Sequence, residues 1–300
     1  MALPCFYISP ELAVFGSGAA PPSPSGKDST AGSNSIPERD VASGSDAGSG
    51  NREIVLDEDT SKHVVQVLRM KPGEQLQLTD GKGNLLTARI VDDHKKKCLV
   101  RIVSMIQHPA REKKVTLAIS LLKNANRLEW LLEKVTEIGV TEIIPLICER
   151  TEKQHFRQDR MQHILVSAML QSQQAWLPAL SMPAPFAEVM GVAGYGQQYI
   201  AHCLETERTS LAEAVRREAG DAAGGVGRTG ASQAAGLSRE MAASREAGSS
   251  IILIGPEGDF SPKEVELALR HGFLPVTLGE TRLRAETAGI VAATLLCITG

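Results

Sequence analysis

Two glycine-bearing segments near the C-terminal end have the residue types and spacing with which a chain can hold a small ligand. Residues 251–261 read IILIGPEGDFS, and residues 278–288 read LGETRLRAETA. In each segment an apolar, strand-like stretch stops at a glycine turn and continues into a helical pattern. Glycine allows the backbone to approach a ligand closely, and amides at such turns can read its polar edges. A single turn of this kind only joins a strand to a helix, whereas two at one sheet edge predict a small-molecule pocket.

Sequence motifs of several common enzyme sites are missing from the chain. It has no GxGxxG after a strand pattern, no GxxxxGK[ST], no HExxH and no GxSxG. These absences argue against a dinucleotide dehydrogenase, a P-loop NTPase, a zinc protease and a serine hydrolase. The two glycine turns remain as the candidate ligand site.

The cysteines and the hydropathy of the chain indicate its compartment. The cysteines are odd in number and form neither a CxxC pair nor a Cys/His cluster, so reduced thiols, no metal site and a cytoplasmic protein are expected. They are Cys5, Cys98, Cys148, Cys203 and Cys297. The first residues do not form a signal peptide, and no apolar run approaches the roughly 18 residues of a membrane span. Neither export nor membrane insertion is expected.

Positive charge is concentrated in one part of the chain. Residues 61–127 contain fourteen Lys or Arg and five Asp or Glu, a net charge of +9, although the whole chain carries −3. Such a segment is typical of a phosphate-binding surface or of a solvated basic face. Arg69 and Lys71 stand beside a Pro-Gly turn, where they either contact phosphate or form an ordinary surface turn.

The first part of the chain predicts a small β domain. A helix is expected over 59–67, and strands over 75–79, 85–91 and 98–106, with the domain ending near residue 113. Residues 16–50 are nearly all Gly, Ser, Ala, Pro, Asp and Asn, a composition that buries too little apolar surface to fold. We interpret them as a disordered, exposed insertion.

The second part alternates between strand and helix patterns, which predicts an α/β domain with a largely parallel sheet over 114–300. Gly139 is expected to end one helix, and Ser261 followed by Pro262 to begin another. Residues 220–249 are predicted to form a second poorly ordered loop. The expected strands are 115–122, 142–148, 199–203, 250–254 and 276–278, and the expected helices 127–138, 157–174, 211–217, 262–271 and 287–298.

Four segments, correctly ordered along the chain, carry a resemblance to a known family. They read HVVQVLRMKPGEQLQLTDG, LEWLLEKVTEIGVTEIIPLICERTEK, IGPEGDFSPKEVE and LGETRLRAETA. In these segments the chain resembles the 16S ribosomal RNA (uracil-N3) methyltransferases of the SPOUT superfamily. The resemblance covers nearly all of the chain except 16–50 and about 207–249.

The resemblance implies both a fold and an activity. A PUA-like, RNA-binding β-barrel would occupy residues 1–113, and a SPOUT α/β domain with a C-terminal trefoil knot residues 114–300. The protein would be a cytoplasmic homodimer that uses S-adenosylmethionine to methylate uracil N3 at one uridine of 16S ribosomal RNA or of the small subunit. No membrane and no metal would take part.

The resemblance also implies which residues contact the methyl donor. His202 matches a position near this pocket, and it could equally be a core histidine whose hydrogen bonds are satisfied. The implied donor-binding residues are His202, Ile254, Gly255, Pro256, Gly258, Leu278, Gly279, Leu283, Arg284, Ala285 and Thr287.

The chemistry of uracil N3 suggests the catalytic groups. Because this nitrogen carries a proton, its methylation requires a proton acceptor and stabilisation of the charge that develops on the flanking oxygens. We hypothesise that Arg284, or alternatively Arg282, stabilises this charge, and that Glu257 or Glu286 accepts the proton. Glu257 could instead serve only as a favourable charge at a helix N-terminus.

RNA contacts are expected from cations and from one polar element. Phosphate contacts are assigned to Arg69, Lys71, Lys123, Arg127 and Arg150. Gln171 and Ser172 belong to an element similar to the family's EQSxR, in which Leu170 and Gln174 replace the glutamate and the arginine. Ala285 likewise replaces the threonine of the family's LRTET.

These departures leave two other functions open. The chain could be a ribosome-assembly factor that binds RNA and has lost methyl transfer, or a methyltransferase with a substrate other than RNA. Which uridine is modified, and whether free RNA or an assembled subunit is the substrate, does not follow from the residues.

Overall fold

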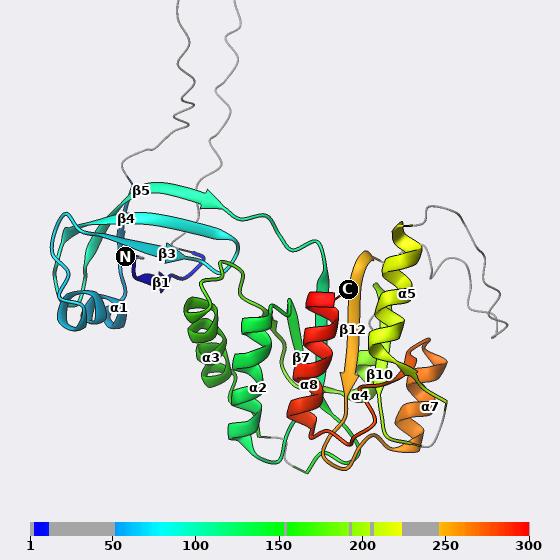
Figure 1. Cartoon of the computed structure of the whole chain (residues 1–300). Coiled ribbons are helices and arrows are strands. Elements are labelled where there is room, and N and C mark those ends of the chain that lie inside the picture. The colour runs from blue at the N-terminus through cyan, green and yellow to red at the C-terminus, as the bar shows by residue number, and fades with distance from the viewer. Residues whose placement is uncertain are drawn as a thin grey trace, which may run out of the picture. The chain divides into compact units, whose positions relative to one another are not determined.

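The computed structural model describes residues 3–11, 52–152, 155–191, 194–204, 207–223 and 246–299. The chain divides into two compact units, one of Met1–Asp80 with Asn84–Gln107 and the other of Gly81–Gly83 with His108–Gly300. Figure 1 shows the helices and strands of both units. The predicted insertion at 16–50 lies outside the described residues.

The first unit is built on a five-stranded sheet with the order β1-β3-β4-β5-β2. Its strands are β1 (Cys5–Tyr7), β2 (Glu53–Val55), β3 (Gln75–Thr79), β4 (Asn84–Asp92) and β5 (Leu99–Gln107). β1 runs parallel to β3, and the other neighbouring pairs are antiparallel. Alternating residues such as Leu76, Leu78 and Leu86 are fully buried in its core. Among the described residues no pairing joins β1 to β2, so closure into a barrel stays a prediction.

A short helical segment precedes the Pro-Gly turn beside which Arg69 and Lys71 stand. α1 (Glu58–Lys62) begins at Asp57, whose side chain accepts a 2.9 Å hydrogen bond from the Thr60 amide, and a π-helix (His63–Val67) continues it. This helical segment ends before Arg69, which has a φ of +57°. Because non-glycine residues adopt this left-handed conformation only rarely, Arg69 is held in a constrained turn.

The second unit contains an eight-stranded sheet with the order β11-β13-β10-β12-β6-β7-β8, in which β9 also pairs with β7. All of its described strand pairs are parallel, which confirms the predicted α/β fold. Its strands are β6 (Lys114–Ser120), β7 (Glu142–Ile147), β8 (Ala179–Leu180), β9 (Ala184–Pro185), β10 (Tyr195–Ala201), β11 (Thr209–Ser210), β12 (Glu246–Ile254) and β13 (Leu274–Thr277).

Helices cover both faces of this sheet, since its strands are apolar on both sides. On one face, α2, α3, α5 and α8 pack against residues such as Leu117 and Ile119. On the other face, α4 and α7 pack against Ala118 and its neighbours. The helices are α2 (Ala125–Ile138), α3 (Gln158–Gln171), α4 (Phe186–Met190), α5 (Leu211–Ala223), α7 (Pro262–Arg270) and α8 (Ala285–Thr294), which a π-helix (Leu295–Thr299) follows.

The chain doubles back across the sheet near its C-terminal end. After β13, α8 packs against α2, β6 and β12 on the far side of β10 (Figure 1). Gly289 permits this approach, since a Cβ there would lie 3.0 Å from Leu131 Cδ1 and 3.1 Å from Ile119 Cδ1. Residues 278–284 are thereby laid across the carboxyl ends of the central strands.

Several predicted boundaries need correction. The predicted loop 220–249 is wrong at both ends, because 220–223 form the last turn of α5 and 246–249 begin β12. Pairing of β12 with β6 and β10 extends the strand beyond what its composition indicates. Residues 224–245 lie outside the described residues. α3 ends at Gln171, three residues before the predicted end at 174, because Gln173 adopts a left-handed conformation with a φ of +56° and the Gln174 amide bonds back to the Met169 carbonyl.

Candidate functional site

Three loops at the carboxyl edge of the parallel sheet enclose a pocket of about 460 Å³. β13, β10 and β12 are neighbours, so the loops that follow them begin side by side. The loop after β10 contributes His202, the loop after β12 contributes Gly255, and the loop after β13 contributes Leu278. In open parallel sheets, ligands bind at this edge beside the point where strand order reverses.

The loop after β12 is a tight turn. The Asp259 amide donates to the Pro256 carbonyl over 2.9 Å, and Asp259 has a φ of +64°. Its carboxylate accepts 2.8 Å hydrogen bonds from the amides of Phe260 and Cys203, so it joins this loop to the end of β10. A Cβ at Gly255 would lie 3.1 Å from Phe260, which makes glycine the residue that fits there.

The start of α7 anchors the same loop. Ser261 caps the helix with Pro262 in the first turn, as the sequence predicts, and Glu264 completes a reciprocal capping box with Ser261. The buried Glu264 carboxylate also accepts a 2.8 Å hydrogen bond from the Glu149 amide after β7. Arg150 donates to the Gly258 carbonyl over 2.7 Å. Contacts from the end of β7 therefore brace the turn from outside the pocket.

The loop after β13 carries the second glycine turn. Gly279 has a φ of +143°, a conformation that side-chain-bearing residues avoid, and its carbonyl accepts a 2.9 Å hydrogen bond from the Thr277 hydroxyl. Arg284 is the N-cap residue of α8. Arg282 and Arg284 line the pocket with exposed side chains. Neither of them forms an ion pair with another described residue, so both cations are available to a ligand.

His202 is a buried wall residue whose hydrogen bonds are not satisfied. Its exposed fraction is 4%, and neither ring nitrogen has a partner among the described residues. Its pKa is lowered, mainly because burial disfavours the imidazolium; Asp259 opposes this effect and Arg208 adds to it. A neutral imidazole with an unused donor and acceptor therefore faces the pocket, which argues against a satisfied core histidine.

The structure brings together most of the residues predicted to bind a donor. Gly258 and Thr287 are absent from the pocket lining; the Gly258 carbonyl instead accepts from Arg150. The lining contains His202, Ile254, Gly255, Pro256, Leu278, Gly279, Leu283, Arg284 and Ala285.

The two candidate proton acceptors have different surroundings. Glu257 lines the pocket, is exposed, and accepts a 3.1 Å hydrogen bond from the Lys123 amide. Glu286 is 6% exposed and lies outside the pocket lining, with one carboxylate oxygen 3.6 Å from Arg127 Nε and the other without a partner among the described residues. Glu257 is thus the better placed of the two.

Three of the predicted RNA-binding cations gather beside the pocket. The Lys123 amide and the Arg150 side chain contact the loop after β12, while Arg127 reaches α8 through Glu286. Lys123 Nζ also forms a 2.7 Å ion pair with Glu152. In the first unit, Lys71 Nζ lies 3.3 Å from Asp93.

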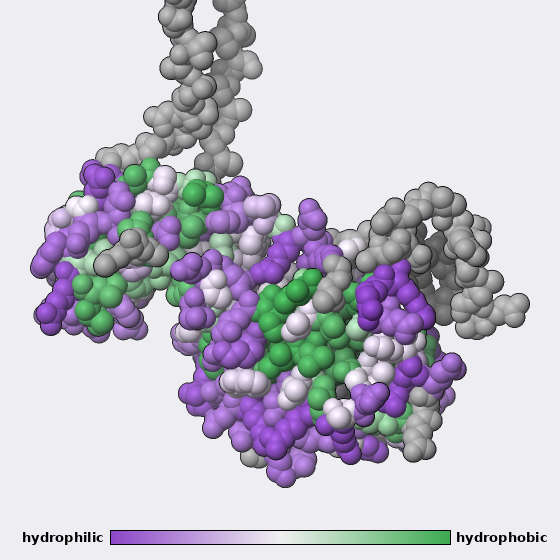
Figure 2. All heavy atoms as spheres, in the orientation of Figure 1, coloured by the Kyte–Doolittle hydropathy of each residue, from purple (hydrophilic) through white to green (hydrophobic). Residues whose placement is uncertain are grey.

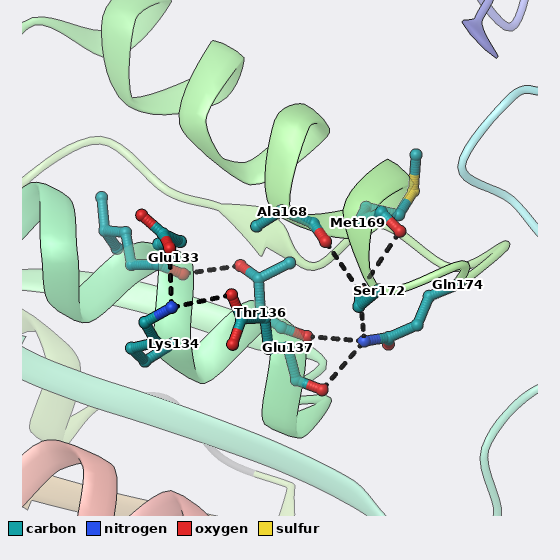
Figure 3. Close-up of polar contacts among 9 residues, drawn as sticks. Glu133, Lys134, Thr136, Glu137, Ala168, Met169, Ser172 and Gln174 are labelled. Atoms are coloured by element: carbon teal, nitrogen blue, oxygen red, sulfur yellow. Dashed lines mark hydrogen bonds and ion pairs between the residues drawn. The ribbon is translucent and has the colours of Figure 1, made fainter. Parts of the chain in front are cut away.

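Gln174 lies at the other end of α2 from Arg127, about 15 Å away by helix length. Gln174 Nε2 donates to the carbonyls of Thr136 and Glu137 over 3.0 Å and to Ser172 Oγ over 2.9 Å (Figure 3). Its Oε1 accepts from Arg111. Gln174 therefore caps the last carbonyls of α2, and the Ser172 hydroxyl is engaged in the same network.

Matches to family models cover most of the described chain. A model described as an RNA methyltransferase domain matches residues 109–297, and one described as an RNA methyltransferase PUA domain matches residues 56–103. The chain belongs to the RNA methyltransferase family. This confirms the resemblance that the four sequence segments carry.

Named relatives and solved structures agree with this membership in the RNA methyltransferase family. Ribosomal RNA small subunit methyltransferase E of Synechocystis sp. is 28% identical, over 77% of this chain and 68% of that protein. A probable rRNA-methyltransferase from Porphyromonas gingivalis is 34% identical, with a TM-score of 0.66 over 80% of this chain and 90% of that one. The Neisseria gonorrhoeae methyltransferase E, solved bound to S-adenosyl methionine, is 26% identical, with a TM-score of 0.63 over 81% and 90%.

Sequence reasoning missed the third loop of the pocket in this RNA methyltransferase. Cys203 and Arg208 of that loop line the pocket, yet neither stands in a recognisable motif for binding. Asp259, in the loop after β12, also lines it and was not singled out, although it lies within the segment IGPEGDFS. Arg208 Nη1 donates to the His202 carbonyl, which brings it to the wall. Within the described ranges, no group of three His, Cys, Asp or Glu side chains is arranged to hold a metal, and no helix is long and apolar enough to cross a membrane.

Proposed function

We propose that the protein transfers a methyl group from S-adenosylmethionine to uracil N3 at one uridine of small-subunit (16S) ribosomal RNA. One observation supports this proposal most strongly: a pocket lies between two glycine turns at the carboxyl edge of the parallel sheet. The chain that forms this pocket belongs to the RNA methyltransferase family. Homologues that bear the small subunit methyltransferase E name support ribosomal RNA as the substrate class. We accordingly place the protein in the cytoplasm, where small subunits are assembled.

The pocket residues fit the methyl donor. A volume of about 460 Å³ suits a ligand of nucleoside size, and the unsatisfied nitrogens of His202 offer polar partners inside the wall. The turns at Gly255 and Gly279 leave backbone next to the cavity without side chains in between. The donor would supply an activated methyl group on its sulfonium, and the chain's own residues would bind it, orient it and exclude water.

The remaining chemistry concerns the uracil. Its N3 proton has to leave, and charge then develops on the two flanking oxygens. Arg284, exposed at the pocket and without an ion-pair partner among the described residues, is our candidate for stabilising that charge, with Arg282 as the alternative. Glu257 is our candidate acceptor, because Glu286 lies outside the lining. A Glu257→Gln variant that kept the full single-turnover rate at saturating donor and RNA would remove Glu257 from this role.

RNA would be held by cations around the pocket. Lys123, Arg127 and Arg150 adjoin the loops that hold the donor, and Arg69 and Lys71 would extend the contacts on the PUA domain. Gln171 and Ser172 are assigned a contact further along the RNA. Each phosphate contact releases counterions, so RNA affinity should fall steeply with salt. Affinity that is independent of salt between 50 and 200 mM would contradict this surface.

The C-terminal helix supports two further parts of the proposal, a trefoil knot and a homodimer. Residues 278–284 cross the strand ends before α8 returns to β6, which is the path a knotted chain end requires. α8 is mostly apolar, with Glu286, Thr287 and Thr294 as its polar residues, and Ile298 in the π-helix after it is 66% exposed. Figure 2 shows apolar surface on this side of the second unit. Such a helix is expected to be covered, and a second copy of the chain is our candidate.

The decisive experiment is a mass-spectrometric comparison of small-subunit RNA from a strain with and without the gene. Loss of one N3-methyluridine, restored by the wild-type chain and not by an Arg284→Met variant, is expected. An unchanged set of methyluridines would overturn the proposal. Donor binding in calorimetry without any transfer to RNA would identify a non-catalytic assembly factor instead.

A further inference from the structure

Two charged residues of the pocket differ from the others in burial. Glu257, Glu280, Arg282 and Arg284 are exposed, whereas Arg208 and Asp259 are partly buried in the wall. They come from different loops and lie near the buried ring of His202, whose pKa they shift in opposite directions. The wall therefore presents one positive and one negative group at the same place.

Neither charge is neutralised by a side chain that the structure describes. Among the described residues, Arg208 and Asp259 form no ion pair with each other or with any other side chain. Arg208 donates to the His202 carbonyl, and Asp259 accepts from the amides of Cys203 and Phe260; the described part of the chain offers them no further hydrogen-bond partner. A guanidinium has five N–H donors and a carboxylate about four acceptor positions, so both keep capacity for a ligand. Partly desolvated charges of this kind interact strongly with a matching partner.

The backbone at Asp259 points in the same direction. Its φ of +64° lies in the left-handed region, which costs a residue with a side chain on the order of 1 kcal/mol and costs glycine almost nothing. A carboxylate is nevertheless present at this turn, at the wall of the pocket. Asp is among the few residues with a side chain that adopt this conformation, and here its carboxylate accepts from the amides of Phe260 and Cys203, so the turn fixes the carboxylate at the wall.

We infer that Arg208 and Asp259 bind the amino-acid head group of the methyl donor, Arg208 holding its carboxylate and Asp259 its ammonium. This inference rests on the proposed donor pocket. An unpaired cation and an unpaired anion in one wall match a zwitterion, which the amino-acid end of the donor is. An RNA phosphate matches Arg208 alone and is repelled by Asp259, and an uncharged base engages neither charge.

Calorimetry with three ligands tests the inference on the full chain. S-adenosylhomocysteine carries the whole head group, decarboxylated S-adenosylmethionine keeps only the ammonium, and 5′-methylthioadenosine has neither charge. Arg208→Met should weaken S-adenosylhomocysteine about 10- to 100-fold, the range of a charge-assisted hydrogen bond, and change the other two by about 2-fold or less. Asp259→Gly should weaken both ligands that carry an ammonium, with methylthioadenosine unaffected.

The variants are chosen so that misfolding does not confuse the result. Glycine accepts the backbone conformation of Asp259 without strain, and unchanged methylthioadenosine binding reports an intact pocket. Arg216→Met, on the exposed side of α5, is the matched control and should leave all three affinities unchanged.

Two results would overturn the inference while leaving the proposed function standing. One is an equal loss for S-adenosylhomocysteine and methylthioadenosine in either variant, which would mean that the residue only positions its loop. The other is wild-type affinity for S-adenosylhomocysteine in both variants. A wild-type chain that binds none of the three ligands would remove the donor pocket itself, and this inference with it.

Discussion

The guanidinium of Arg150 donates to the Gly258 carbonyl over 2.7 Å, which joins the end of β7 to the loop after β12. A longer contact of 3.4 Å reaches the Phe260 carbonyl. A residue expected from the sequence to contact RNA phosphate thus also holds a wall of the pocket. One side chain thereby links the surface assigned to RNA with the loop assigned to the donor.

Removing this brace should weaken donor binding. Arg150→Met deletes both hydrogen bonds to the loop, and because the side chain is exposed we expect only about a 3- to 10-fold loss of S-adenosylhomocysteine affinity in calorimetry. Arg157→Met, an exposed arginine outside this pocket, is the control and should keep wild-type affinity. Equal affinities for Arg150→Met and the control would show that the loop holds its shape unaided.

Gln174 should matter for stability. Gln174→Ala leaves the last carbonyls of α2 and the Arg111 guanidinium without their partner, and we expect the free energy of unfolding in urea to fall by about 1–3 kcal/mol. The exposed Gln171→Ala variant should remain within about 0.5 kcal/mol of the wild type. If both variants unfold alike, the network in Figure 3 does not stabilise the helix end.

The reactivity of the cysteine thiols can report whether a ligand occupies the pocket. Cys203 is exposed in the pocket wall, whereas burial raises the pKa of Cys148 to about 12 and that of Cys98 to about 11, so these two have almost no reactive thiolate near pH 7.5. N-ethylmaleimide should modify Cys203 well before either of them in peptide mass spectra. Saturating S-adenosylhomocysteine should slow modification of Cys203 at least about 5-fold. Modification at an undiminished rate would place the ligand elsewhere.

His202 should make stability depend on pH. The folded chain lowers its pKa from the ordinary value of 6.5, mainly by burial, so the unfolded chain takes up this proton more readily. The contribution of neutral His202 is complete above about pH 6.5 and is lost as pH falls from there toward the lowered folded pKa. The unfolding free energy of the wild type should therefore drop more between pH 7.5 and pH 5.5 than that of His202→Gln. Parallel curves for the two chains would contradict the burial effect.

Local sequence patterns predicted the parts of the site that are formed by main-chain turns and helix starts. The glycines at 255 and 279 mark turns after apolar strands, and the order Ser261-Pro262 with Glu264 forms a cap within four residues. Such signals need only neighbouring positions, so the helix starts and the pocket edge could be read directly. The same holds for Gly139, which ends α2 with a φ of +104°.

Contacts between distant residues explain what the sequence did not reveal. Asp259 meets the Cys203 amide because β10 and β12 pair in parallel. Arg208 meets the His202 carbonyl six residues back along the same loop, in a stretch whose sequence carries no binding motif. Glu286 looked like a pocket residue because it follows Arg284, but the helical turn directs it toward Arg127 on α2. The two-residue strands β8, β9 and β11 are too short to show any periodicity.

Because α8 packs back against β6, the ligand-binding pocket forms late in the folding of the chain. α2, β6 and β12, against which α8 packs, all precede it in the chain, and the segment leading into it forms one wall of the pocket. The sheet, the helices before α8 and two of the three pocket loops can therefore form before the ligand-binding pocket exists. As the chain is synthesised, the pocket can form only after residues 278–288 have been added, so binding of the donor reports that α8 has packed against the sheet.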